Sequence, residues 1–391
     1  MTSSTSESAV ELSAAQESLL DRVNELGPQL VELSHAIAAD PELAYQESRA
    51  AQRCAELLER GGFGVERGAY GLPTAFAARA GTRGPHVVIC AEYDALPGVG
   101  HACGHNIIAA SALGAGLALR TIADDIGLRV TVLGTPAEES GGGKVDMIRV
   151  GAFEDVDAAM MVHPAPYDQY DAPGLAIEEW DIVYTGRASH SSSAPELGRN
   201  ALDGVVAGYT AIAMLRQHLG PLQQVHGIIT DGGEAPNVVP ERAAAAYYLR
   251  AIDMSGLDDL RGRVRSCLIG AAEATGTEVA IRTVGNAYDP VRPHPALVEA
   301  FARSCRAIGR PFTPDPDGDD LGGSTDFGNV SQLVPAVHGE LAVYSWPVVN
   351  HQHEFAATCV TAAGDRTMLD GAAALALTAL AVAEDPGILS A

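Results

Sequence analysis

The segment GVGHACGHN, residues 98–106, holds three side chains that could bind a metal or do thiol chemistry: His101, Cys103 and His105. Thiolate and imidazole suit zinc and other borderline-soft metals. Cys103 and His105 are two residues apart, so on a turning loop both can point to one centre. Two other interpretations stay open at this point: Cys103 as a buried core thiol, and Cys103 as a nucleophile with a histidine as its base.

Later segments supply carboxylates and further imidazoles. Glu138 and Glu139 are adjacent in TPAEES, just before a run of glycines. Adjacent carboxylates point in different directions, so one can bind a metal while the other acts as a general base; the alternative is a solvated acidic turn. His163 in MVHPAP ends an apolar run, where a ligand would lie, although core histidines also occur at such positions. The remaining candidates are His190 in RASHSSSAP and, in NHQHEF, His351 and His353.

The elements predicted around these segments belong to an α/β fold. Short apolar runs at residues 86–91, 128–133 and 157–162 predict buried strands, and each is followed by a polar segment. Residues 16–38 and 106–118 have the apolar pattern of helices. Because sites in such sheets lie at the carboxyl ends of the strands, we expect the three polar segments to meet there.

A second domain is predicted inside the first. Residues 174–288 read as strand, helix, two strands, helix and strand, the order of a ferredoxin-like α+β domain. We therefore expect a catalytic, metal-binding domain with a mixed sheet and flanking helices, formed by residues 1–173 and 289–391. Residues 174–288 would be the inserted domain.

Composition excludes some partners. The chain of 391 residues has a formal net charge of −25, which argues against nucleic acid and against anionic membranes as partners. No basic and apolar leader precedes the first helix, and no run of about twenty apolar residues is present. The six cysteines are scattered, unlike a disulfide scaffold. A cytoplasmic protein with reduced thiols is expected.

Taken together and in order, the segments resemble the M20 metallopeptidase family. The resemblance is carried by HACGHN, PAEES, VHPAP, the His190 segment followed by GRNALDGV, GGEAPNVVPERA and GSTDFGNVS, and it extends from about Pro41 to Phe355. The order is similar to that of the amidohydrolase branch. EYDALPGVGHACGHN and GSTDFGNVS are most similar to the subgroup of M20 domain-containing protein 2 and the aminobenzoyl-glutamate hydrolase subunits.

The resemblance implies a role for each candidate residue. It implies a zinc-peptidase-like catalytic domain with two divalent metal ions, zinc or manganese, and an inserted lid domain through which two chains form a homodimer. Glu138 would be the general base, and Asp94 would orient a ligand. The implied metal ligands are Cys103, His105, Glu139, His163 and His351. The implied substrate contacts are His190, Asn237, Arg250 and Thr325, with His190 also stabilising the oxyanion, often in the partner subunit's site.

Two positions depart from the family pattern. Glu92 stands where the wider family has a metal-binding histidine, so His105 or His101 is expected to take up that work. Whether Glu92 itself replaces that ligand stays open, and of the two histidines His101 is expected to be structural or to support a ligand. Thr325 stands where many relatives carry a glutamate, which changes how the pocket meets a substrate.

The expected activity is hydrolysis of an amide bond by a metal-activated water. The substrate would be a dipeptide or N-acyl amino acid with a free carboxylate, and aminobenzoyl-glutamate-like or β-alanyl-dipeptide-like compounds fit. Arg250 and Asn237 could hold that carboxylate. Two alternatives remain: a cysteine hydrolase that uses Cys103, and a non-catalytic binding protein on the same fold.

Overall fold

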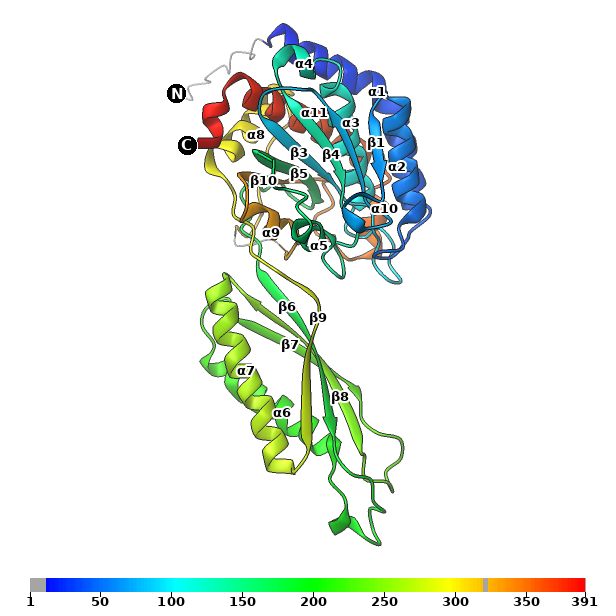
Figure 1. Ribbon diagram of the computed structural model, residues 1–391, viewed down its shortest axis with the longest axis vertical. Helices are drawn as coiled ribbons and strands as arrows, with labels where there is room; N and C mark the ends of the chain where they lie inside the picture. Colours follow the sequence, from blue (N-terminus) through cyan, green and yellow to red (C-terminus); the bar gives the residue numbers. More distant parts are fainter. Residues whose placement is uncertain (1–11, 319–322, 391) are drawn as a thin grey trace, which may run out of the picture. The chain divides into compact units, whose positions relative to one another are not determined.

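The computed structural model describes residues 12–318 and 323–390, and the chain divides into two units (Figure 1). The first unit comprises the described residues up to Ala172 together with residues 292–318 and 330–390. The second comprises residues 173–291 and 323–329. Residues 1–11, on which the expectation of no leader rests, lie outside the described residues.

The structure groups one segment differently from the expected domains. Everything after residue 288 was assigned to the first domain, yet residues 323–329, which include Thr325, belong to the second unit. The reason is a tertiary contact, because the backbone N–H of Leu175 donates to the carbonyl oxygen of Gly323 at 3.1 Å. That contact joins the segment to the start of the inserted domain across almost 150 residues of sequence, and no local pattern reports it.

The first unit is built on a mixed sheet, as predicted. Among the described residues this sheet has six strands in the order β1-β2-β4-β3-β5-β10. The neighbours β4-β3-β5-β10 are parallel, while β1 and β2 add antiparallel pairs at one edge. The strands are β1 (Gly64–Arg67), β2 (Phe76–Ala80), β3 (His86–Ala91), β4 (Arg129–Gly134), β5 (Ala158–Ala165) and β10 (Ala336–Ala342). Because parallel strands end at the same edge, the segments that follow β3, β4 and β5 are brought close together.

Helices cover this sheet and bury its apolar strands. The helix α3 is buried on all sides and packs on β3, β4 and β5, while α1 and α11 pack against α3. The helices are α1 (Ala14–Ala38), α2 (Ser48–Arg60), α3 (His105–Leu119), α4 (Ala123–Ile126), α5 (Gly143–Arg149), α8 (Pro295–Ala307), α9 (Phe327–Ser331), which spans the last change of unit, α10 (His353–Thr358) and α11 (Ala362–Glu384).

The helix α11 is long and apolar enough to cross a membrane by length and composition, and it was not singled out from the sequence. In this fold 78% of its most apolar window is buried inside the protein. Its Asp370 pairs with Arg310 at 3.0 Å, an ion pair that belongs to a protein core. Packing in the first unit therefore accounts for its apolar sequence.

The second unit has the predicted ferredoxin-like arrangement. Its elements follow the order strand, helix, two strands, helix and strand, and the described strands form one antiparallel sheet in the order β7-β8-β6-β9. Both helices pack on one another and on β8, around a core separate from that of the first unit. The elements are β6 (Ala176–Thr185), α6 (Ala201–Leu215), β7 (Gln224–Asp231), β8 (Arg242–Ala251), α7 (Met254–Thr275) and β9 (Glu278–Tyr288).

Candidate metal centre

Acidic and imidazole side chains meet at the carboxyl edge of the parallel strands in the first unit. Glu92 and Asp94 follow β3, the pair Glu138 and Glu139 follows β4, and His163 lies near the end of β5. All five side chains are buried or nearly so. The neighbouring strands β4, β3 and β5 therefore deliver carboxylates and an imidazole to one place, the arrangement that sites in α/β sheets use.

The loop before α3 adds Cys103 and His105. Between them, Gly104 has φ of +79°, and a Cβ at this position would lie 2.3 Å from Pro164 Cγ. Only glycine fits this left-handed turn. The turn ends as His105 begins α3, and both Cys103 Sγ and the His105 ring face the carboxylates.

His351 completes the set from the segment after β10. Its backbone φ is +71°, a left-handed conformation that is uncommon for a residue with a side chain. Its N–H donates to the carbonyl of Ala102 at 2.8 Å, which ties this segment to the Cys103 loop. His353 begins α10 and is exposed, and among the described residues it belongs to no group of converging ligand atoms.

The ligand atoms are spaced as they would be around metal ions. Ligands about 2.0–2.3 Å from one ion in a tetrahedron lie roughly 3.3–3.8 Å from each other. Cys103 Sγ lies 3.5 Å from His163 Nε2 and 3.6 Å from His351 Nε2. Glu139 Oε2 lies 3.8 Å from His351 Nε2, and Glu139 Oε1 lies 3.6 Å from His105 Nε2. Among the described residues, the groups with converging donors are Cys103, His105 and His163; Cys103, Glu139 and His351; and Glu92, His105 and Glu138.

Buried atoms without partners support the same conclusion. Glu92 Oε2, His105 Nε2 and Glu139 Oε1 have no hydrogen-bond partner within residues 12–318 and 323–390. Burial raises the pKa of Glu139 to about 7, although His105 acts in the opposite direction. Burial, followed by the charge of Glu139, raises the pKa of the Cys103 thiol well above its ordinary range. Both shifts show that negative charge on these side chains is poorly compensated by the protein. Divalent cations would compensate it by pairing with the Cys103 thiolate and the Glu139 carboxylate.

Asp94 holds two of these ligands. Its Oδ1 accepts a hydrogen bond from His105 Nδ1 at 3.0 Å, and its Oδ2 accepts the backbone N–H of Glu139 at 2.9 Å. The first contact leaves His105 Nε2 as the ligand atom. Burial opposes ionisation of Asp94, but the charge and hydrogen bond of His105 hold its pKa below the ordinary value.

The surroundings of Cys103 do not suit a nucleophile. A reactive cysteine needs a lowered pKa and access to solvent. Cys103 is buried, its pKa is raised, and its sulfur lies between two imidazoles that belong to the ligand groups. The geometry favours Cys103 as a ligand shared by two of those groups.

The structure bears on two positions that the sequence left open. Glu92 stands in place of a histidine ligand, and its carboxylate lies in a group of converging donor atoms with His105 and Glu138. His101 was a candidate for its work, but it is absent from every ligand group among the described residues. Burial lowers the pKa of His101 to about 4, so it is a neutral buried ring. The sequence alone could not decide the role of Glu92, because the position of its carboxylate depends on contacts with residues distant in the sequence.

A further residue, Glu47, was missed altogether. It lies just before α2, and its Oε1 accepts the backbone N–H groups of Tyr45 and Ala137 at 2.8 and 2.9 Å. Ala137 has φ of +62°, a strained conformation for a residue with a Cβ, directly before Glu138. Glu47 therefore fixes the turn that aims the two adjacent glutamates. Its partner is 90 residues away, so only the sequence DPELAYQE before a helix could have drawn attention to it.

The predicted substrate contacts all belong to the second unit. Arg250 donates to Ser324 Oγ at 2.7 Å, beside Thr325. Thr325 is buried and its hydroxyl accepts the N–H of Phe327 at 3.2 Å, so it also shapes the turn before α9. Asn237 is exposed, and its carbonyl accepts the N–H of Ser191, next to His190.

The ring of His190 has a defined tautomer. Its Nδ1 accepts the backbone N–H groups of Ser192 and Ser193 at 3.3 and 3.2 Å. In the neutral ring the proton is then on Nε2, which becomes a hydrogen-bond donor on an exposed side chain. This is the form that an oxyanion needs.

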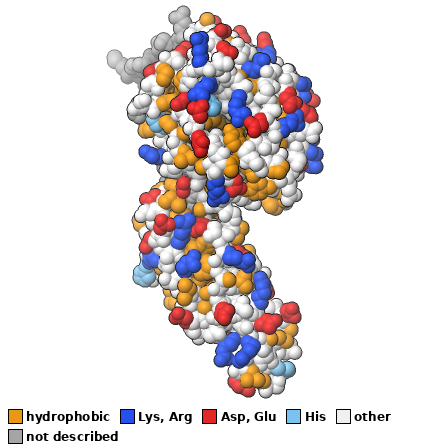
Figure 2. Space-filling model, in the orientation of Figure 1, with side chains coloured by type: hydrophobic (Ala, Val, Ile, Leu, Met, Phe, Trp, Pro, Cys, Tyr) orange, Lys and Arg blue, Asp and Glu red, His pale blue; other side chains and the backbone are white. Residues whose placement is uncertain are grey.

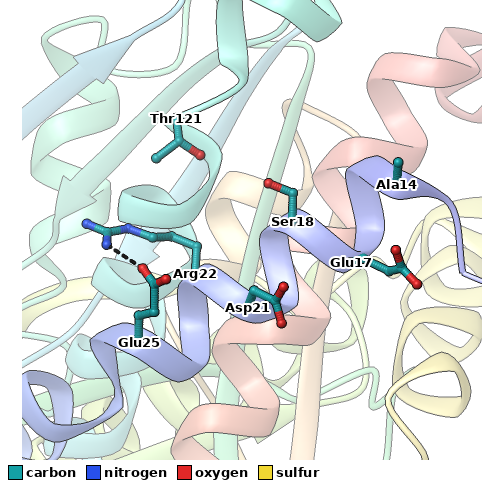
Figure 3. A pocket seen from close by; sticks show the side chains of 7 residues that line it. All are labelled: Ala14, Glu17, Ser18, Asp21, Arg22, Glu25 and Thr121. Carbon is teal, nitrogen blue, oxygen red and sulfur yellow. Dashed lines mark hydrogen bonds and ion pairs between the residues drawn. The ribbon is translucent and has the colours of Figure 1, made fainter.

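A shallow pocket on the surface of α1 does not resemble the metal centre, because the side chains that line it do not converge on one point. It is lined by Glu17, Ser18, Asp21 and other side chains of α1, together with Thr121. Figure 3 shows these side chains diverging along the helix, while Arg22 turns to Glu25, with which it pairs at 2.9 Å. It reads as a solvated helix surface.

Comparison with known proteins places the chain in a peptidase family. Residues 88–380 match peptidase family M20/M25/M40. The chain is 39% identical to the Xaa-Arg dipeptidase of Mus musculus over 98% of this chain and 92% of that protein, and 38% identical to the Homo sapiens Xaa-Arg dipeptidase over 94% and 88%. It is 34% identical to one of the subunits of the p-aminobenzoyl-glutamate hydrolase of Escherichia coli (strain K12), over 69% of this chain and 60% of that protein.

Solved structures show the same fold. The aminobenzoyl-glutamate utilization protein from Klebsiella pneumoniae superposes with a TM-score of 0.73 at 19% identity, covering 93% of this chain and 98% of that one. A Bacillus subtilis protein described as a dinuclear metal-binding peptidase of the M20 family superposes with a TM-score of 0.71 at 19% identity, covering 93% and 99%.

Proposed function

This chain belongs to peptidase family M20/M25/M40, and on that premise we propose that it is a metal-dependent hydrolase of the amide bond in dipeptides or N-acyl amino acids. The observation that carries the proposal is the cluster at the edge of the parallel strands, which is largely buried except for His351. It offers two overlapping ligand groups that share Cys103, with Glu138 beside them. Cys103, His105 and His163 would hold one ion, and Cys103, Glu139 and His351 the other. A thiolate shared by both favours zinc over manganese.

The side chains of the cluster have different roles in the proposed reaction. Bound divalent ions would supply Lewis acidity toward the amide carbonyl and toward water. Glu138 Oε2 lies 3.7 Å from His105 Nε2, so its carboxylate stands at the ligand cluster as a base. It would take a proton from the attacking water and return it to the leaving amine. Asp94 keeps His105 and Glu139 in place while this happens.

The substrate class follows from the relatives and from charge. Two relatives that align with nearly the whole chain are named Xaa-Arg dipeptidases, so a dipeptide with a basic C-terminal residue is the first substrate to test. The net charge of −25 would attract such a cation to the protein, even though acidic and arginine side chains are interspersed on the face shown in Figure 2. Arg250, paired only with a serine hydroxyl among the hydrogen bonds described, could accept the substrate carboxylate.

The test is a hydrolysis screen on metal-free protein to which zinc or manganese is returned. The panel contains Xaa-Arg dipeptides, the same dipeptides with C-terminal glutamate, N-acetyl amino acids and aminobenzoyl-glutamate. We expect turnover that disappears with a chelator and returns with metal, fastest on the Xaa-Arg series and reduced by added salt. Metal-loaded protein that cleaves none of these amides would contradict the proposed function.

We also propose that two chains pair through β7. This strand is at the edge of its sheet, and no strand in the described part of the chain pairs with its outer side. Ile228 and Ile229 on it are exposed, Ile228 by 66%. An edge with apolar side chains is a site for pairing with another strand. Ile228→Lys should give a monomer in analytical ultracentrifugation. Met214→Lys, at an equally exposed position on α6, is the control and should leave the dimer intact. A dimeric Ile228→Lys variant would contradict this proposal.

Pairing would let His190 act on the partner subunit's site, as its outward Nε2 donor suggests. Glu138→Ala and His190→Ala should each be inactive as homodimers. If the two act in different chains, a mixed dimer contains one site with both side chains intact, so mixing the variants should restore activity. Activity that is not restored in a proven mixed dimer would show that His190 acts within its own chain or not at all.

A further inference from the structure

The chain has a single lysine, Lys144, and it is fully buried beside the metal centre. The other 24 basic residues are arginines. A buried ammonium is unfavourable unless an anion compensates it. Lys144 lies in the first turn of α5, and the proposed catalysis assigns it no part. Its position therefore requires an explanation.

Lys144 holds one oxygen of Glu92. The ammonium Nζ donates to Glu92 Oε1 at 2.6 Å, and both side chains are inaccessible to solvent. A compact ammonium suits a single carboxylate oxygen, whereas a guanidinium fork would engage both. The contact therefore leaves Glu92 Oε2 available.

That second oxygen faces His105. Glu92 Oε2 lies 3.6 Å from His105 Nε2, and neither atom has a hydrogen-bond partner among the described residues. The separation is too long for a hydrogen bond. It matches the roughly 3.3–3.8 Å expected between two ligands of one ion. Because Asp94 occupies His105 Nδ1, the two lone pairs are aimed at the same space.

We propose that Glu92 is a metal ligand through Oε2 and that Lys144 is its fixed counter-ion, which orients the carboxylate through Oε1 when no metal is bound. The ligand is a divalent cation at His105, so the inference rests on the proposed function. Glu92 then supplies the ligand that the wider family takes from a histidine at this position.

Charge balance agrees with this assignment. Lys144 and two divalent cations together carry five positive charges. Among the described residues placed in the cluster above, five groups are anionic: Glu92, Asp94, the Cys103 thiolate, Glu138 and Glu139. Without Lys144, the extra carboxylate would leave a net negative charge in a buried site.

The competing interpretation is a structural ion pair that has no contact with metal. Two variants separate it from the proposal. Glu92→Gln combined with Lys144→Met removes both charges of this pair at once, so neither member is left facing a neutral side chain. Lys144→Met alone leaves Glu92 with only the metal to compensate it. Glu178→Gln combined with Arg261→Met, a largely buried pair in the second unit at 2.5 Å, is the matched control.

The experiment titrates metal-free protein with zinc and with cobalt. It records the number of ions bound, the visible absorption of the cobalt complex, and the melting temperature with and without metal. For the Glu92–Lys144 double variant we expect one of the two ions to bind at least about tenfold more weakly and the cobalt spectrum to change. We expect the gain in melting temperature on adding metal to be largest for Lys144→Met, smaller for the wild type and smallest for the double variant. The control should match the wild type.

The outcomes are distinguishable. A double variant that binds two ions with wild-type affinity and an unchanged cobalt spectrum overturns the role of Glu92. Equal metal-induced gains in melting temperature in all proteins overturn the role of Lys144. Should Lys144→Met fail to fold, the double variant still decides the question. A wild type that binds no ion would instead refute the proposed function.

Discussion

Asp94→Asn is expected to weaken metal binding without exchanging any proposed ligand. The Asp94 carboxylate accepts two hydrogen bonds at once, from His105 Nδ1 at 3.0 Å and from the N–H of Glu139 at 2.9 Å. Asparagine has one carbonyl oxygen, so it can keep one of these bonds, and its NH₂ group then faces the other donor. A hydrogen bond to a charged group contributes about 1.5–3 kcal/mol.

This energy sets the expected size of the effect. Since 1.4 kcal/mol is about a tenfold change in an equilibrium constant, metal affinity should fall about 10- to 100-fold. The assay is competition between metal-free protein and a chromophoric chelator for zinc. Because His105 holds the pKa of Asp94 below its ordinary value, Asp94 stays ionised near neutrality and the loss should be the same at pH 6.5 and pH 8. Asp21→Asn, on the exposed side of α1, is the control. Wild-type affinity in Asp94→Asn would refute the positioning role.

Three further predictions follow from buried groups. Burial raises the pKa of Glu47 to about 7 from 4.5, so the folded protein holds a proton that the unfolded chain has released between these values. The free energy of unfolding should therefore fall by about 3 kcal/mol as the pH rises from 4.5 to about 7. Glu47→Gln mimics the protonated form, so urea unfolding of the metal-free variant should depend less on pH than unfolding of the wild type. Parallel pH profiles of the two proteins would contradict this prediction. Arg310→Met leaves Asp168 and Asp370 without their buried cation, and the free energy of unfolding should fall by about 3–5 kcal/mol; a loss below 1 kcal/mol would mean that the network contributes little. Cys103→Ala should lose bound metal, measured by elemental analysis, whereas full metal content with lost activity would favour the nucleophile interpretation.

The parallel strands and their order along the chain were accessible from the sequence. The apolar run at residues 86–91 coincides with β3, and the predicted helix 106–118 is α3 with one residue more at each end. Strands of this kind are recognisable because they are buried on both faces and therefore apolar throughout. Polar residues that follow such a run stand out, which is why Glu138 and Glu139 could be singled out, whereas Asp94 was identified through the family resemblance.

Features that depend on tertiary contacts were not accessible. Glu92 and Lys144 are 52 residues apart in the sequence and meet only through the tertiary fold, which brings the start of α5 to the residue after β3. Neither residue type is expected in a core, so sequence patterns give them no weight. Glu47 also depends on a tertiary contact, because its carboxylate accepts the backbone N–H of the distant Ala137. The segment that contains Thr325 is joined to the second unit by the hydrogen bond between Leu175 and Gly323, which local sequence does not report.

The central claim is that Glu138 acts as a base beside metal ions that other side chains hold. The most direct measurement compares metal content and turnover in the wild type and in Glu138→Gln, with the amide substrate that the screen identifies. We expect both proteins to bind the same number of ions, and turnover of Glu138→Gln to fall by about 10²- to 10⁴-fold, the contribution usual for general base catalysis. A Glu138→Gln variant that hydrolyses the substrate at the wild-type rate would contradict the account.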